Sequence, residues 1–154
     1  MRKAARSVGL FYLVGHGIED GLIQDVLKVS RHLFALPKKD KLAIEMVNSP
    51  HFRGYNRAGF EHTRGKPDWR EQIDIGPERP ARPFGRGAPP WMRLQGPNQW
   101  PATFPEFKRT LLAYEDETTA LAIKVLRAFA ASAIIARAAN RLRPLAIAAP
   151  VARE

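Results

Sequence analysis

The chain contains no cysteine in its 154 residues. Disulfides, thiolate nucleophiles and thiolate metal sites are therefore excluded together. The same absence fits a reducing compartment, and a cytoplasmic location is expected. Hydrophobic residues make up 45% and charged residues 26% of the sequence, which is close to the average of globular proteins and predicts a folded domain.

Long hydrophobic runs are also missing. A membrane helix needs roughly 18 consecutive apolar residues, whereas the best apolar stretch covers residues 8–14 and is followed at once by Gly15. Met1-Arg2-Lys3 resembles the start of a signal peptide, but no small-residue cleavage site follows a long enough apolar segment. We expect neither a membrane segment nor a signal peptide.

Negative charge is scarce: 25 Lys and Arg residues face 15 Asp and Glu residues, a net charge of +10. An excess of this size is compatible with nucleic-acid binding, and the three tryptophans Trp69, Trp91 and Trp100 could stack on bases. The arginines are scattered, however, and the runs mix signs, as in Lys38-Lys39-Asp40-Lys41. A solvated basic surface without specific nucleic-acid binding is favoured, and a small basic module for nucleic acid or an acidic protein remains the alternative.

The first 48 residues are expected to form a strand and two helices. Residues 8–14 are aromatic and aliphatic throughout, which is typical of a strand buried on both faces. Helical spacing of apolar residues begins after Glu19 and ends at Pro37, which can start a second helix over residues 38–47. The apolar stripe of the first helix comprises Leu22, Ile23, Val26, Leu27, Ser30, Leu33 and Phe34.

Residues 49–100 are rich in Gly, Pro and Arg, and we expect an irregular region with one short strand at 72–75 and with its tryptophans packed. A long helix follows, since Thr103 and Glu106 have capping-box spacing and Pro105 suits a first helical turn. Its apolar stripe comprises Phe107, Leu111, Tyr114, Thr118, Leu121, Val125 and Phe129.

The last 24 residues differ in composition. Residues 131–154 are almost wholly Ala, Arg, Ile, Leu and Pro, with a helix expected as far as Asn140. We therefore divide the chain into a domain at 1–130 and a low-complexity tail at 131–154. A shifted reading frame in a GC-rich gene would produce such a tail, and a genuine divergent terminus is the alternative.

Four phrases in the chain follow one another in a distinctive order and together cover residues 8 to about 129. They are the run from Val8 to Ile18; Leu33-Phe34-Ala35-Leu36-Pro37 with Lys41; Arg53-Gly54-Tyr55, Glu61-His62-Thr63 and Lys66-Pro67-Asp68-Trp69-Arg70-Glu71-Gln72-Ile73-Asp74-Ile75-Gly76; and Gly96-Pro97-Asn98-Gln99-Trp100-Pro101. In this order and spacing they resemble the N-terminal region of the non-haem iron(II) dioxygenases related to isopenicillin N synthase.

The resemblance implies a mixed α/β, helix-dominated region that packs around a later double-stranded β-helix. In that family the later core carries a His-x-Asp and a distant His that bind Fe(II), and an Arg-x-Ser that holds 2-oxoglutarate. This sequence contains no Arg-x-Ser, and no His-x-Asp or His-x-Glu begins at His16, His32, His51 or His62. We therefore expect a truncated N-terminal part without the β-helix core, without catalytic or metal residues, and inactive by itself. The full-length parent would oxidise a small molecule.

Two residues of the third phrase are candidates for substrate binding. By resemblance, Arg53 and Tyr55 reach over the substrate pocket of the parent enzyme, where Arg53 would suit a carboxylate. In this chain alone, a surface arginine and a packed tyrosine are favoured. His16 is expected to be structural, and the cluster Glu61, His62, Asp68 and Glu71 is expected to be ion-paired with nearby Lys and Arg rather than to bind iron.

Without the core, residues 8–14 and the stripe of the long helix from Phe107 to Phe129 would expose apolar surface. Marginal stability and self-association are therefore expected. A regulatory partner of a full-length homologue is a third reading of the chain.

Overall fold

The structure is a computed structural model that describes residues 7–83, 85 and 87–142, with side chains as far as Ser132. Helices predominate over four short strands and two 3-10 turns, and the described residues form no closed barrel, so the expectation of a mixed, helix-dominated fold is confirmed. The chain divides into two compact units, one made of Ile18–Asp116 and the other of Met1–Gly17 with Glu117–Glu154.

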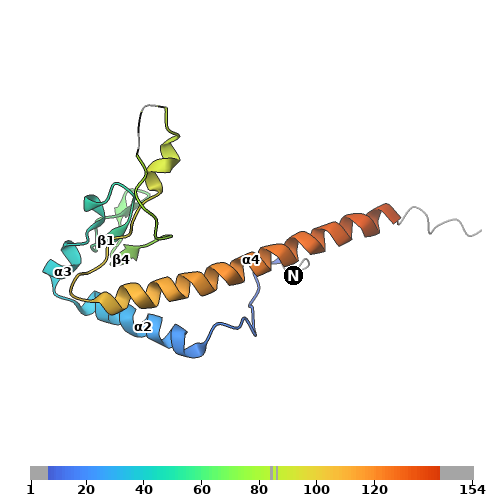
Figure 1. Cartoon of the computed structure of the whole chain (residues 1–154), viewed down its shortest axis with the longest axis horizontal. Coiled ribbons are helices and arrows are strands. Elements are labelled where there is room, and N and C mark those ends of the chain that lie inside the picture. The colour runs from blue at the N-terminus through green and yellow to red at the C-terminus, as the bar shows by residue number, and fades with distance from the viewer. Residues whose placement is uncertain (1–6, 84, 86, 143–154) are drawn as a thin grey trace, which may run out of the picture. The chain divides into compact units, whose positions relative to one another are not determined.

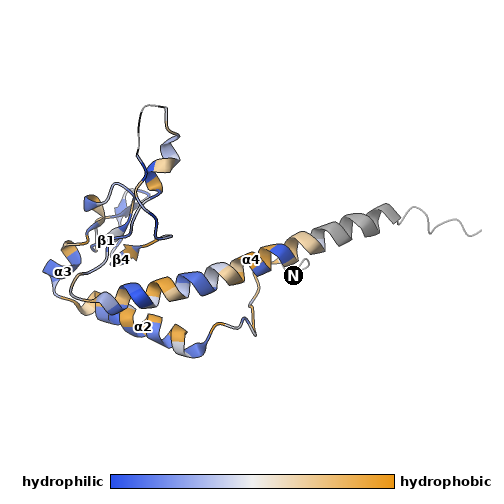
Figure 2. Ribbon diagram, viewed as in Figure 1, coloured by the Kyte–Doolittle hydropathy of each residue, from blue (hydrophilic) through white to orange (hydrophobic). Residues whose placement is uncertain are grey.

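The core of the unit Ile18–Asp116 lies between α2 (Asp20–Ala35) and the first turns of α4 (Pro105–Leu142) (Figures 1 and 2). Helix α2 begins where the sequence predicts. Its buried residues are Val29 and Leu33, whereas Leu27 and Phe34 of the predicted stripe are 44% and 36% exposed. The buried residues of this core are Val29, Leu33, Ile44, Tyr55, Phe104 and Phe107.

The second predicted helix is shorter than expected. Helix α3 covers only Lys38–Leu42, and the 3-10 turn η1 follows at Met46–Asn48. The backbone amide of Tyr55 donates to the carbonyl of Ile44 at 2.8 Å, and Glu45 forms a parallel bridge with Tyr55. The prediction of helix over 38–47 is wrong beyond Leu42. The amides of Ile44 and Glu45 still donate to Lys41 and Leu42 in tight turns, but the carbonyl of Ile44 accepts from Tyr55 of a distant strand instead of from a further helical turn.

Strands β1 (Gly54–Asn56) and β4 (Gln72–Asp74) pair antiparallel, with Tyr55 opposite Ile73. Strands β2 (His62–Thr63) and β3 (Lys66–Pro67) form a hairpin with the two-residue turn Arg64-Gly65. Both turn residues have positive φ, as a type I′ turn requires. The predicted strand at 72–75 is confirmed and ends one residue earlier. The region predicted as otherwise irregular also holds β1, β2, β3 and the 3-10 turn η2 (Pro90–Leu94).

Helix α4 runs from Pro105 to Leu142. Proline at its first position is confirmed, although the helix starts one residue later than a Thr103 cap would place it. All seven residues of the predicted stripe are buried or partly shielded, so the stripe is confirmed as the covered face and the expectation that it is exposed is wrong. The helical prediction through Asn140 is confirmed, and residues 143–154 of the expected tail lie outside the described residues. No helix in the described part of the chain is long and apolar enough to cross a membrane.

Residues 8–14 do not form the predicted strand. A strand requires another strand to accept and donate its backbone hydrogen bonds, and none of the four described strands lies in the same compact unit. The expected exposure of this segment is confirmed, since Tyr12 and Val14 are 94% and 86% exposed. Within the same unit, the ring of Phe11 contacts that of Phe129, with centroids 5.9 Å apart.

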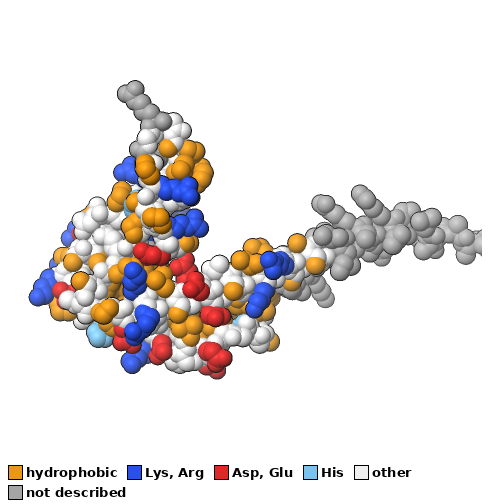
Figure 3. All heavy atoms as spheres, in the orientation of Figure 1, with side chains coloured by type: hydrophobic (Ala, Val, Ile, Leu, Met, Phe, Trp, Pro, Cys, Tyr) orange, Lys and Arg blue, Asp and Glu red, His pale blue; other side chains and the backbone are white. Residues whose placement is uncertain are grey.

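Charged side chains of both signs are interspersed on the face drawn in Figure 3, in keeping with a solvated basic surface.

The expected packing of the tryptophans is wrong for Trp69 and Trp91, which are 82% and 60% exposed. Only Trp100 packs, edge-on against Phe107, with its indole N–H donating to Glu78. The exposed ring of Trp69 lies beside Gly59, where an added Cβ would come within 3.4 Å of it.

Candidate functional site

Arg53 immediately precedes β1, and its guanidinium is fixed by backbone carbonyls. Nη1 donates to the carbonyls of His51 and Phe52 at 3.2 and 3.0 Å, and Nη2 donates to Leu94 at 3.3 Å. The group lies flat against Gly76, where a Cβ would come within 2.5–2.9 Å of it. Nε is buried, and no described residue accepts its hydrogen bond. One donor of a held cation is therefore left without a partner.

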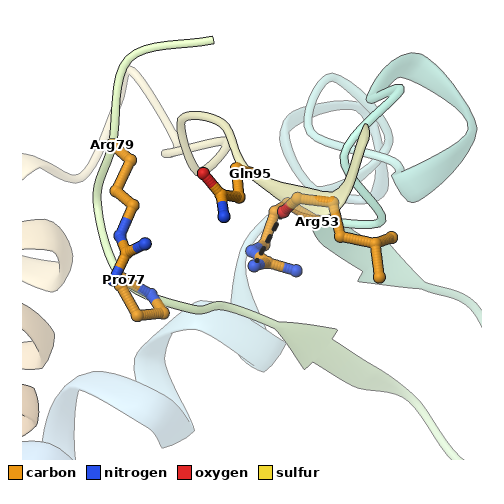
Figure 4. A pocket seen from close by; sticks show the side chains of 5 residues that line it. Arg53, Pro77, Arg79 and Gln95 are labelled. Carbon is orange, nitrogen blue, oxygen red and sulfur yellow. Dashed lines mark hydrogen bonds between the residues drawn. The ribbon is translucent and has the colours of Figure 1, made fainter. Parts of the chain in front are cut away.

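A cavity of about 140 Å³ lies beside this guanidinium. Arg53 and Arg79 border it on opposite sides, and the carboxamide of Gln95 lies between them (Figure 4). The remaining lining residues are Pro77 and Leu94. Lys41, Arg57 and Arg70 form ion pairs, but among the described residues no carboxylate pairs with Arg53 or Arg79. The cavity therefore carries two positive charges without a counter-ion, which suits an anion.

Asn98 holds the wall of the cavity that carries Arg79. Its Oδ1 accepts from the amide of Gly76 at 2.9 Å, and its Nδ2 donates to the carbonyl of Gly76 and to Glu78 at 2.6 and 2.8 Å. Burial works to raise the pKa of Glu78, but hydrogen bonds from Asn98 and Trp100 outweigh it and keep that pKa below its usual range. Glu78 is thus held as a carboxylate by hydrogen bonds from Asn98 and Trp100, and within the described part of the chain it forms no ion pair with Arg79.

Gly54 and Gln99 fix the backbone on which Arg53 stands. Gly54 has φ +127°, a conformation that L side chains rarely adopt. Nε2 of Gln99 donates to the carbonyls of Arg53 and Glu45 at 2.8 and 2.9 Å and approaches that of Ile44 at 3.3 Å. The close packing of Gln99 on the backbone at Gly54 leaves no space for a Cβ there.

Tyr55 lies in the core and does not line the cavity. Residues two apart share a face in a regular strand, but the positive φ of Gly54 breaks that alternation between Arg53 and Tyr55. Burial raises the pKa of the Tyr55 hydroxyl, and the charge and hydrogen bond of Glu71 raise it further. Nζ of Lys41 lies 5.5 Å from the ring centroid and donates to Glu71 at 2.8 Å. Tyr55 and Lys41 are therefore buried against Glu71, whose side chain is partly exposed.

The expected ion-pairing of the carboxylate cluster is confirmed for three of its members. Glu61 and Asp68 lie 3.7 and 3.8 Å from Arg70, and Glu71 pairs with Lys41. Nδ1 of His62, the fourth member, lies 3.3 Å from the carbonyl of Phe60.

The chain matches a family model described as the N-terminal region of non-haem dioxygenases, named for morphine synthesis, over residues 1–103. The four phrases and this match both point to the N-terminal region of the same dioxygenases. The chain belongs to this family.

Several dioxygenases are similar to the chain. It is 44% identical over 119 residues to a 2-oxoglutarate-dependent dioxygenase, frbJ, of a Dothideomycetidae species, covering 77% of this chain and 31% of that protein. It is 39% identical over 125 residues to a homoarginine-6-hydroxylase of Arabidopsis thaliana, covering 81% and 37%. A probable iron/ascorbate oxidoreductase of Dictyostelium discoideum is 31% identical, with 86% and 38% covered. The chain thus spans about a third of the length of these relatives.

The described residues of this dioxygenase region do not fit an iron centre. No group of three or more His, Asp or Glu side chains is placed among them to hold a metal ion. Nδ1 of His51 lies 2.8 Å from the carbonyl of Arg93, and His32 stacks on Phe104 with ring centroids 4.2 Å apart. No step of the family's chemistry is therefore assigned to these histidines.

The sequence pointed to Arg53 but not to Arg79 or Gln95. Both lie in the segment that was predicted to be irregular, where periodicity carries no information about which side chains meet. Lys41 was part of a recognised phrase, yet its burial was missed because Lys38-Lys39-Asp40-Lys41 has the composition of a solvated helix. The sequence held one signal of close packing at this site, the glycines Gly54 and Gly76. A Cβ at Gly54 would overlap Gln99, and a Cβ at Gly76 would overlap Arg53.

Proposed function

We propose that the chain supplies the N-terminal, substrate-contacting part of an iron(II)- and 2-oxoglutarate-dependent oxygenase of small molecules, and that it is inactive by itself. Family membership and the 2-oxoglutarate-dependent relatives support the oxygenase class. The observation that carries the role of this chain is that Arg53 and Arg79 line one cavity and that no described carboxylate pairs with either. In this proposal Arg53 binds a carboxylate of the substrate.

The fixed position of Arg53 supports this role. A guanidinium whose Nη1 and Nη2 already bond to carbonyls loses little further freedom when an anion arrives. Its charge is delocalised and permanent, so the guanidinium attracts a carboxylate in the cavity at any relevant pH. Tyr55, the other candidate, enters the proposal through β1, since its buried contact with Glu71 and Lys41 holds the strand that follows Arg53.

Propanoate is expected to bind the full chain weakly but saturably at Arg53. The measurement is the ¹H–¹⁵N signal of the arginine Nε–H groups during titration, with the Arg53 signal assigned by its loss in Arg53→Gln. The Arg53 signal should shift, and Arg53→Gln should remove the saturable binding. The matched control is Arg57→Gln, because Arg57 is half-exposed and already paired with Glu45. Equal shifts at every exposed arginine, without saturation, would contradict the proposal.

The purified chain is expected to bind no iron(II) stoichiometrically and to show no 2-oxoglutarate turnover. The physical reason is that scattered histidines do not form a preorganised site, so ordering them would cost more than a weak ligand set returns. Anaerobic iron titration followed by calorimetry tests the expectation. A one-to-one complex with a micromolar or lower dissociation constant would rule out the inactive-fragment part of the proposal.

A further inference from the structure

We propose that the cavity beside Arg53 takes a short dicarboxylate, with one carboxylate at Arg53 and the second at Arg79. This inference rests on the proposed function, because it keeps Arg53 as the contact for the first carboxylate. It names the substrate class of that site and assigns Arg79 as a residue that determines its specificity.

The residues that line the cavity carry charge of only one sign. Arg53 and Arg79 are positive, whereas Pro77, Leu94 and Gln95 are neutral. Backbone carbonyls hold the η nitrogens of Arg53, and they accept hydrogen bonds without cancelling its charge. Among the described residues no carboxylate forms an ion pair with either arginine. A single carboxylate in the cavity would therefore neutralise one guanidinium and leave the other uncompensated.

Glu78 is the carboxylate nearest to Arg79 in the chain, and it is engaged elsewhere. Its Oε2 accepts from Nδ2 of Asn98 at 2.8 Å and from the indole N–H of Trp100 at 3.0 Å. Within the described part of the chain it forms no ion pair with Arg79. The positive charge of Arg79 is therefore available to a ligand.

A ligand meets Arg53 at the η end of its guanidinium. Nε is buried, whereas the hydrogen bonds of Nη1 to Phe52 and of Nη2 to Leu94 lie at exposed positions. Each η nitrogen carries two N–H groups, and among the described residues only Leu94 accepts from Nη2. One N–H of Nη2 therefore remains for a carboxylate. Arg79, which is exposed, borders the cavity on the opposite side (Figure 4).

The size of the cavity limits the distance between the two carboxylates. A water molecule occupies roughly 30 Å³ of the liquid, so a cavity of about 140 Å³ has the room of only a few water molecules. Two carboxylates joined by one or two carbons fit this space and can contact both sides of it. A long linking chain would have to leave the cavity.

Succinate and succinamate form the test pair, since they differ only in that a neutral amide replaces one carboxylate. The full chain is titrated with each at a pH of about 7.5, where every carboxyl group of both ligands is ionised. The dissociation constants are taken from the Arg53 Nε–H signal. Succinate should bind about fivefold more tightly, as expected for one further ion pair that is open to water. Added salt should narrow this difference, because it screens exposed charges.

Arg79→Gln should reduce the preference for succinate to less than about twofold and leave succinamate binding nearly unchanged, because only the second carboxylate loses its partner. The matched control is Arg82→Gln, at an exposed arginine of the same segment that does not line the cavity. It removes the same charge and should keep the fivefold preference. Both arginines are exposed, so neither substitution should alter the fold, which the backbone ¹H–¹⁵N spectrum checks.

The outcomes separate this inference from the proposed function. If propanoate and succinamate both fail to shift the Arg53 signal, the proposed function falls and the inference falls with it. If they bind at Arg53 but succinate binds no more tightly, or if Arg79→Gln keeps the preference for succinate, only the dicarboxylate site is wrong. An equal loss of preference in Arg79→Gln and Arg82→Gln would show that overall charge selects succinate, and it would remove Arg79 from the site.

Discussion

Gly54→Ala is expected to lower the free energy of unfolding by about 4 kcal/mol, enough to unfold a marginally stable chain. The φ of +127° at Gly54 disfavours any L side chain. A Cβ there would also overlap the carbonyl oxygen of Ile44 and Nε2 of Gln99. Neither can yield freely, since Ile44 accepts from the amide of Tyr55 and Gln99 bonds to Arg53 and Glu45. Backbone strain and about two lost hydrogen bonds add up to the stated loss.

Urea denaturation followed by circular dichroism measures this effect. The matched control is Gly65→Ala, because Gly65 also has positive φ (+78°) but has open space where its Cβ would be. That variant carries the conformational cost without the overlap and should lose only about 1 kcal/mol. A Gly54→Ala variant no less stable than Gly65→Ala would show that the close approach of Gln99 and Ile44 does not constrain the site.

Lys41→Met is expected to lower the free energy of unfolding by about 2–3 kcal/mol. Lys41 is 7% exposed, and its Nζ donates both to Glu71 and to the carbonyl of Phe34 in the last turn of α2. Methionine fills the same volume but leaves that carbonyl and the carboxylate of Glu71 without their donor. Breaking a fully buried pair costs about 3–5 kcal/mol; the Glu71 side chain is 37% exposed, so water compensates for part of the loss.

Lys39→Met is the control, since Lys39 is exposed on the same short helix α3. It should change the unfolding free energy by less than about 0.5 kcal/mol. A second measurement follows Tyr55: the positive charge of Lys41 works to lower the pKa of its hydroxyl, so alkaline absorbance titration of Lys41→Met should show that pKa raised further. Identical stabilities of the two lysine variants would mean that the Lys41–Glu71–Tyr55 contact contributes nothing to the fold.

The sequence by itself determined the elements that rest on local periodicity. The spacing of apolar residues predicted α2 and the covered stripe of α4 from Phe107 to Phe129, since a helix bonds to itself and its pattern is contained in one segment. Short-range composition also placed β4 near Ile73. The phrase Arg53-Gly54-Tyr55 pointed to the family and to the arginine of the cavity before any contact was known.

Only the tertiary structure decided which distant residues meet. The early end of α3 depends on a hydrogen bond from Tyr55 to Ile44, and residues 8–14 lack a strand partner despite their β-like composition. The cavity joins Arg53 to Gln95 from different segments, and Lys41 is buried because Glu71 and Phe34 accept from its ammonium group. Such contacts are invisible to local patterns, because a strand or a polar cavity exists only when the chain brings its other half alongside.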